Sequence, residues 1–292
     1  MKYFVMLHVL FTCCLLGIGS ARADEPVSNE QADSEDRIRR ATLNEMRDRV
    51  NTIRVASVVD DQTSKELKLN PEPILRYNDQ PRGILDATLW SWSDGGRPAA
   101  IIKLEKYRKD ESHPREWLDN LTSFSPGLVR AEWKHGITWQ ARQPALMLEA
   151  LPDGPRPAPS KPARLSQMKR ISRRFTCSLY NIVTKQRDEM RLLTTQLLRY
   201  SEVDTGIIDG VMLGFANNGT NPDCLFVVEL QKAVNGDHSW KYGFAGMTQG
   251  ELTAKLDGRK VWTKQWTVKR GKQDTWIWFF DEDVEGLKAL KQ

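Results

Sequence analysis

Residues 75–87 read LRYNDQPRGILDA, and residues 198–210 read LRYSEVDTGIIDG. Both stretches place Leu-Arg-Tyr, an acidic residue and Gly-Ile-(Leu or Ile)-Asp at matching positions, with a constant offset of 123 from Leu75 to Leu198. Self-similarity at a fixed offset is the sequence signature of a repeated structural unit. The repeated phrase predicts one structural unit written twice, and it favours a role for the phrase itself as scaffold.

The similarity extends in both directions from the phrase. Upstream, Lys65–Leu69 matches Asp188–Leu192 at the same offset. Downstream, after a small insertion in the second copy, Ile101–Lys106 aligns with Val227–Lys232. A chance match of one phrase would not keep its register over this distance, so we predict an internal duplication.

The stretch ALPDGPRPAPSKPAR (150–164) separates the two copies. Its prolines remove backbone donors and favour extended chain, which is typical of a linker. The acidic, polar residues 24–34 indicate disorder. The predicted division is a signal peptide (1–23), a disordered N-terminal segment (24–34), a first repeat unit (35–149), a Pro-rich linker (150–164) and a second repeat unit with a C-terminal extension (165–292).

Each copy begins with a helical pattern and continues with strand patterns. Leu43, Met46 and Val50 recur at helical spacing, and residues 165–175 repeat this spacing. Apolar runs then flank the turns Asp94-Gly95-Gly96 and Asn217-Asn218-Gly219, which are hairpin signals because such turns need positive φ. The predicted fold class is α+β, with two duplicated units, each a helix followed by an antiparallel meander of about five strands.

The first residues have the features of an export signal. Lys2 is followed by the apolar stretch 3–16, which is short for a bilayer span, and Ala21-Arg22-Ala23 gives a small-x-small cleavage site. We therefore expect cleavage after Ala23 and a periplasmic or extracellular protein that does not span the membrane. Cleavage removes Lys2 and Arg22 from the 43 basic residues and none of the 38 acidic ones, so the mature chain stays weakly basic.

Basic residues are concentrated in one predicted helix, where Lys169, Arg170, Arg173 and Arg174 lie close together. Such a face is often only solvated, and contact with an anionic partner is the alternative. No zinc-finger or RNA-recognition motif accompanies it, which argues against nucleic acid. Partners therefore stay open between an envelope polymer and a protein.

Cys177 and Cys224 are the cysteines that remain after cleavage. In an oxidising compartment they form either one disulfide or two buried thiols, and the sequence leaves both open. No CxxC is present and the histidines are scattered, so no metal site is expected, and no motif indicates a cofactor.

Asp86 and Asp209, with Arg76 and Arg199, are the candidate catalytic residues. Equivalent carboxylates from two related halves can form an acid–base pair. The alternative is that each aspartate pairs with the arginine of its own copy or with local backbone. The triplet Asp204-Thr205-Gly206 has no carboxylate counterpart in the first copy, which argues against an aspartic protease.

Tryptophans can bind sugars by stacking, and the candidates for an open platform are Trp133, Trp139, Trp262 and Trp266, because they stand beside polar, turn-rich sequence. In contrast, residues 276–280 (WIWFF) are apolar at every position, which predicts a strand buried on both faces.

The chain resembles a group of uncharacterised exported proteins of planctomycete-type bacteria. The resemblance rests on Leu75-Arg76-Tyr77, on Arg82-Gly83 leading to Trp90-Ser91-Trp92, on Gly96-Arg97-Pro98 and on the 165–174 helix. It implies export and no established activity. The favoured interpretation is a non-catalytic binding or structural module built by duplication. The alternative is a hydrolase acting on envelope or extracellular polymer through a carboxylate pair between the two units.

Overall fold

The two repeated phrases each form a bulged β-hairpin in the computed structural model. In the first, β4 (Leu75–Asp79) pairs with β5 (Ile84–Ser93), and in the second, β13 (Leu198–Glu202) pairs with β14 (Ile207–Ala216). The glycines that enter the second strand, Gly83 and Gly206, have φ values of 74° and 76°, a left-handed conformation that favours glycine.

The structure describes residues 29–60, 63–109, 115–182, 184–233, 236–266 and 275–281. The predicted signal peptide lies outside these ranges. Contacts divide the chain into residues 1–40 and residues 41–292, and all that follows concerns the second unit unless stated. Among the described residues, no helix combines the length and the apolar character needed to cross a bilayer.

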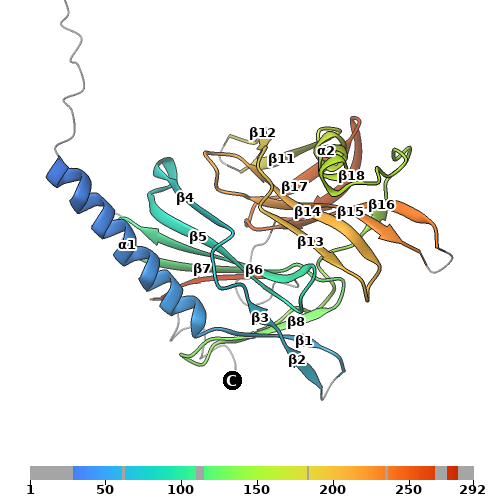
Figure 1. The fold of residues 1–292 in the computed structure, drawn as a ribbon. Coiled ribbons are helices and arrows are strands. Elements are labelled where there is room, and N and C mark those ends of the chain that lie inside the picture. Colours follow the sequence, from blue (N-terminus) through green and yellow to red (C-terminus); the bar gives the residue numbers. More distant parts are fainter. Residues whose placement is uncertain are drawn as a thin grey trace, which may run out of the picture. The chain divides into compact units, whose positions relative to one another are not determined.

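Every strand pair in the described ranges is antiparallel, and the strands form three sheets (Figure 1). The four-stranded sheet has the order β2–β1–β8–β9, with bounds Ser64–Glu66, Arg54–Val58, Leu128–Glu132 and Thr138–Gln140. The six-stranded sheet has the order β19–β7–β6–β5–β3, with β4 beside β5; its other bounds are Trp276–Phe280, Trp117–Ser123, Pro98–Tyr107 and Lys68–Leu69. The nine-stranded sheet has the order β10–β16–β15–β14–β12–β11–β17–β18, with β13 beside β14; its other bounds are Glu149–Ala150, His238–Gly246, Cys224–Lys232, Gln186–Leu192, Phe175–Asn181, Leu252–Leu256 and Arg259–Lys264. The predicted antiparallel sheets are confirmed, and their combination with two helices in the described residues is consistent with an α+β or a mostly β class.

Two helices accompany these sheets in the described part of the chain, α1 (Asn29–Asn51) and α2 (Lys161–Ser172). From α1, Met46 and Val50 are fully buried in one core with side chains of β5 and β6. From α2, Met168 and Ile171 are buried in a second core with side chains of β14 and β15. Ser160 caps α2 by accepting a hydrogen bond from the Ala163 amide, as expected for a serine before a helix.

A third core joins the two larger sheets. Leu89 and Ile101 from the six-stranded sheet are packed with Met212 and Val227 from the nine-stranded sheet, and all four are fully buried. Each of these sheets therefore has one face toward its helix and the other toward the opposite sheet. The polar groups that lie between the sheets form the candidate site described below.

We call residues 41–140 the first half and residues 161–266 the second half. Corresponding hairpins in the two halves have corresponding registers, and these registers correct one part of the sequence alignment. Ala87 is opposite Glu105, and Gly210, its counterpart, is opposite Glu229. Glu229 therefore occupies the position of Glu105, whereas the sequence alignment matched it with Lys103. The alignment of 101–106 with 227–232 is therefore two residues out of register. A shift of two keeps each side chain on its face of the strand, but it matches each polar residue with the wrong counterpart.

The strand count and several boundaries differ from the sequence predictions. In the described residues the first half contains β1 to β9 and the second β11 to β18, rather than about five strands each. Residues 29–34, assigned to a disordered segment, are helical. Part of the Pro-rich linker packs on the second half: the Leu151 amide donates to the Trp240 carbonyl, and the Trp240 indole donates to the Pro155 carbonyl.

The edge strands of the two large sheets are exchanged between the halves. β19 follows the second half in the chain but pairs with β7 of the first half. β10 follows the first half but pairs with β16 of the second half. The C-terminal extension was assigned to the second unit, and its described strand instead completes the sheet of the first.

Candidate functional site

The four candidate catalytic residues form two separate local ion pairs. Arg76 donates to both oxygens of Asp86, with Nε at 2.9 Å from Oδ1, and Arg199 donates to Asp209 at 2.9 and 2.7 Å. Arg164 of α2 also donates to Asp209 at 2.9 Å. Burial acts to raise the pKa of Asp209, but the hydrogen bonds from the two arginines more than offset this and lower it. None of the four predicted residues lines the pocket described below, so the geometry supports the local alternative.

A double-mutant cycle tests this local role. The single variants Arg76→Ala and Asp86→Ala and their combination are expected to give a coupling free energy of about 1 kcal/mol in urea unfolding, because the pair is only partly exposed and bidentate. A coupling energy near zero would contradict the assigned pairing.

The four candidate platform tryptophans do not form one surface. Trp133 is buried, and its indole donates to Asp119 at 2.8 Å. Trp139 is also buried in the first core. Trp262 packs on Phe244 with ring centroids 5.4 Å apart. The prediction of an open platform is therefore wrong for Trp133 and Trp139, because the turn-rich sequence beside them does not expose the rings. Trp262 is half-buried, and its role stays a prediction.

Of the four tryptophans, Trp266 lines a pocket between the two large sheets, which is described below. It is half-buried at the end of the described part of the second half. Its neighbours in the pocket wall come from elsewhere in the chain, as described below.

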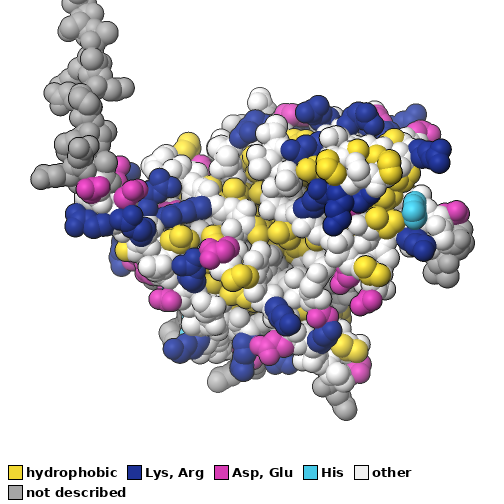
Figure 2. Space-filling view, viewed as in Figure 1, with side chains coloured by type: hydrophobic (Ala, Val, Ile, Leu, Met, Phe, Trp, Pro, Cys, Tyr) yellow, Lys and Arg dark blue, Asp and Glu magenta, His cyan; other side chains and the backbone are white. Residues whose placement is uncertain are grey.

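The basic residues of the predicted anionic contact lie on α2 and just after it. Arg174 is engaged by Asp257 at 2.6 Å. The side chains of Lys169, Arg170 and Arg173 have no hydrogen-bond or ion-pair partner in the described ranges. Figure 2 shows Lys and Arg side chains gathered where α2 lies in Figure 1. Both interpretations of this face, solvated or partner-binding, stay predictions.

The two cysteines are buried free thiols on β11 and β15. Burial, together with the hydrogen bond to Cys177, raises the pKa of the Cys224 thiol well above its ordinary value. Of the two alternatives left open, the structure therefore contains the buried thiol pair.

A pocket of about 460 Å³ opens between the two large sheets. One wall is aromatic, because Trp276, Trp278 and Phe280 alternate along β19 and project from the same face. Their rings are neighbours, with centroids 6.2 Å apart for Trp276–Trp278 and for Trp278–Phe280. Tyr107 continues the row, 5.6 Å from Phe280. Trp278 and Phe280 are half-buried, which corrects the prediction that this strand is buried on both faces.

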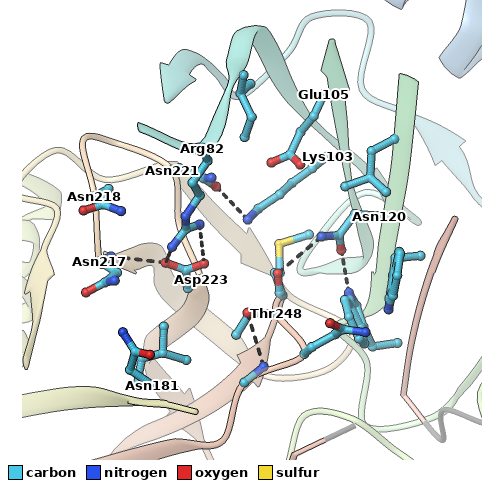
Figure 3. A pocket seen from close by; sticks show the side chains of 18 of the residues that line it. Arg82, Lys103, Glu105, Asn120, Asn181, Asn217, Asn218, Asn221, Asp223 and Thr248 are labelled. Carbon is cyan, nitrogen blue, oxygen red and sulfur yellow. Dashed lines mark hydrogen bonds and ion pairs between the residues drawn. The ribbon is translucent and has the colours of Figure 1, made fainter. Parts of the chain in front are cut away.

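The opposite wall carries carboxamide groups from the second half. Figure 3 shows Asn217 and Asn218 across the pocket from Asn120. The side-chain amides of Asn217, Asn218 and Gln249 have no hydrogen-bond partner within the described residues. Asn120, in contrast, accepts from the Trp276 indole and donates to the Met247 carbonyl. Three amides of this wall are therefore available to a ligand.

The floor of the pocket is a buried polar network. Arg82 donates to both carboxylate oxygens of Asp223 at 2.8 and 3.0 Å. Lys103 donates to Asn221 at 2.7 Å, and Asn221 donates to Asp79 at 3.1 Å (Figure 3). Burial lowers the pKa of Lys103, an effect that the nearby carboxylates partly oppose.

Glu105 is the remaining charged residue of the floor. The hydroxyl of Tyr77 donates to Oε1 at 2.7 Å, and that of Tyr107 donates to Oε2 at 3.1 Å. Burial and the adjacent Glu105 carboxylate raise the pKa of Tyr107, so this hydroxyl remains a donor at neutral pH. Glu105 is 3 % exposed and lines the pocket.

The described residues contain no group of three or more His, Cys, Asp or Glu side chains suited to hold a metal ion. Comparison with family models, with curated proteins and with solved structures finds no match.

Proposed function

We propose that this is an exported, non-catalytic binding module that takes a carbohydrate in the pocket between its two large sheets. The observation that carries the proposal is the composition of the walls: a row of aromatic rings along β19 faces carboxamides that have no partner among the described residues. Sugar rings present apolar faces for stacking and hydroxyls for hydrogen bonds, and ligand sites commonly combine apolar walls with a few polar groups.

We further propose that the two halves arose by duplication. The repeated phrase, the paired bulged hairpins and the matched ion pairs Arg76–Asp86 and Arg199–Asp209 support this origin. The pocket is then a feature that the first sheet and the second sheet make together rather than one that each copy contains.

Hydrolysis is the second candidate, because Glu105 and Asp223 bring carboxylates from both halves to one pocket. Arg82 holds both oxygens of Asp223, which favours a structural ion pair over a group that must change its bonding during a reaction. We therefore favour binding, and an assay for new reducing ends on bound oligosaccharides separates the two.

The test is a calorimetric and tryptophan-fluorescence titration of the mature protein with cello-, xylo-, manno- and chito-oligosaccharides. Trp278→Ala is expected to weaken binding at least about tenfold, since a stacked aromatic ring contributes on the order of 1–2 kcal/mol. Trp262→Phe is the matched control, because Trp262 does not line the pocket. Equal affinity of the wild type and Trp278→Ala, or no binding of any oligosaccharide, would overturn the proposal.

A further inference from the structure

Glu229 is a buried glutamate of the second half whose carboxylate has every acceptor position filled. It is 0 % exposed, and its carboxylate accepts four hydrogen bonds. Arg97 supplies two, at 2.6 and 2.8 Å, one to each oxygen. Tyr200 and Gln231 supply the others, both at 2.6 Å. A carboxylate has about four acceptor positions, so this one has none left.

Glu105 occupies the equivalent position in the first half, but only two of its acceptor positions are filled. Tyr77 binds Oε1 just as Tyr200 binds Glu229, and Tyr107 binds Oε2 in place of Gln231. The two positions that a guanidinium fills on Glu229 have no hydrogen-bond donor on Glu105 among the residues that the structure describes. This carboxylate is buried from solvent in general, yet it faces the pocket.

The missing donor can be traced to one hairpin. Arg97 stands just before Pro98, where β6 begins, and Asn221 stands before Pro222 at the corresponding place ahead of β15. Asn221 is too short to imitate Arg97, and its amide is already engaged by Lys103 and Asp79. Arg97 of the first half therefore pairs with Glu229 of the second half, whereas Asn221 of the second half does not provide a guanidinium for Glu105.

The charges of the pocket floor indicate that a ligand group beside Glu105 would be cationic. Three carboxylates, on Asp79, Glu105 and Asp223, face two cations, on Arg82 and Lys103. One oxygen of Asp79, itself 2 % exposed, has no hydrogen-bond partner within the described ranges of the chain. Buried carboxylates are costly unless they are paired. A cationic group beside Glu105 would balance this floor.

We propose that Glu105 receives the protonated amine, and an adjacent hydroxyl, of an amino sugar whose ring stacks on the aromatic wall. The two donors take the places that the Arg97 nitrogens take on Glu229. The wall is close enough for one ring to reach both, because Tyr107 contacts Glu105 and also packs on Phe280. This inference rests on the proposed carbohydrate function and assigns its substrate class.

The experiment compares three matched oligosaccharides by calorimetry on the full mature chain: glucosamine oligomers with free amines, N-acetylglucosamine oligomers and glucose oligomers. The wild type is expected to bind the free-amine oligomer at least about tenfold more tightly than the other two, since hydrogen bonds to charged groups contribute about 1.5–3 kcal/mol. Glu105→Gln keeps the shape and removes the charge, and it is expected to abolish this preference. The control Glu189→Gln, on an exposed residue of β12, removes the same charge outside the pocket.

The outcomes separate the two proposals. If all three oligomers bind the wild type with similar affinity, the amino-sugar inference is overturned and the carbohydrate function stands. If none binds, both fall. If the preference is present but Glu189→Gln reduces it as much as Glu105→Gln does, the effect is one of net charge and the assignment to Glu105 is wrong. The wild-type comparison decides the substrate class even if Glu105→Gln does not fold.

Discussion

Glu229→Gln is expected to lower the free energy of unfolding by about 3–5 kcal/mol, the usual cost of removing one partner of a buried ion pair. The variant leaves the guanidinium of Arg97, whose side chain is 11 % exposed, without a counter-charge between the two sheets. It also replaces a carboxylate that accepts four hydrogen bonds with an amide that accepts fewer.

Urea unfolding followed by tryptophan fluorescence measures this loss. Glu105→Gln is the matched control, because it changes the equivalent residue of the other sheet, to which no arginine of the described residues donates a hydrogen bond. We expect the control to lose much less stability. If the two variants lost the same amount, the difference assigned to Arg97 would be wrong.

Lys264→Met is expected to stabilise the protein at pH 7, by about 2 kcal/mol, and to lose this advantage as the pH rises. Burial lowers the pKa of Lys264 from 10.5 to about 8, an effect that the nearby Cys224 opposes in part. Below pH 8 the ammonium is charged in both the folded and unfolded states, and the folded state carries the cost of burying it. Between pH 8 and 10.5 the unfolded chain binds more protons than the folded one, so the stability of the wild type rises with pH.

The magnitude follows from the size of the shift, since each pKa unit corresponds to about 1.4 kcal/mol. Contacts of the ammonium with the Trp276 ring, 5.3 Å away, reduce the expected gain. The measurement is the difference in unfolding free energy between the wild type and Lys264→Met from pH 7 to pH 10.5, which cancels the other titrating groups. A difference that does not change over this range would show that Lys264 is not desolvated.

The sequence predicted the repeated hairpins well because their signals are local. Asp257-Gly258 adopts positive φ at both residues, 48° and 82°, in the turn between β17 and β18 that this dipeptide predicts. The turns Asp94-Gly95-Gly96 and Asn217-Asn218-Gly219 likewise lie between paired strands, as predicted: the first between β5 and β6, the second between β14 and β15. The strands β1 and β11 were missed because each follows a helix within a few residues and continues the same apolar pattern.

The pocket could be predicted only in part, because its walls come from segments far apart in the chain. The WIWFF stretch predicts a strand, but an all-apolar strand does not reveal which face meets a core and which meets a cavity. Ile277 and Phe279 are buried in the first core, while Trp278 and Phe280 border the pocket. Polar neighbouring sequence therefore indicates Trp266 as a pocket residue but does not indicate Trp276, Trp278 or Phe280.

Glu105 was overlooked for a different reason. Sequence alignment paired Glu229 with Lys103, two positions away, and so hid the fact that both sheets carry a glutamate at the same place. Side chains alternate between the two faces of a strand with a period of two, so an alignment that is wrong by two residues still fits the pattern of buried and exposed positions. Only the pairing of Ala87 with Glu105, and of Gly210 with Glu229, fixes the correspondence.

The exchange of edge strands has a consequence for the order in which the molecule is completed during synthesis. The sheet of the first half receives β19, which the ribosome makes after the whole second half. Until then Ile277 and Phe279 are missing from the first core, and one wall of the pocket does not exist. The half that is translated first is therefore expected to finish folding last, and the pocket between the large sheets is complete only when the final described strand is in place.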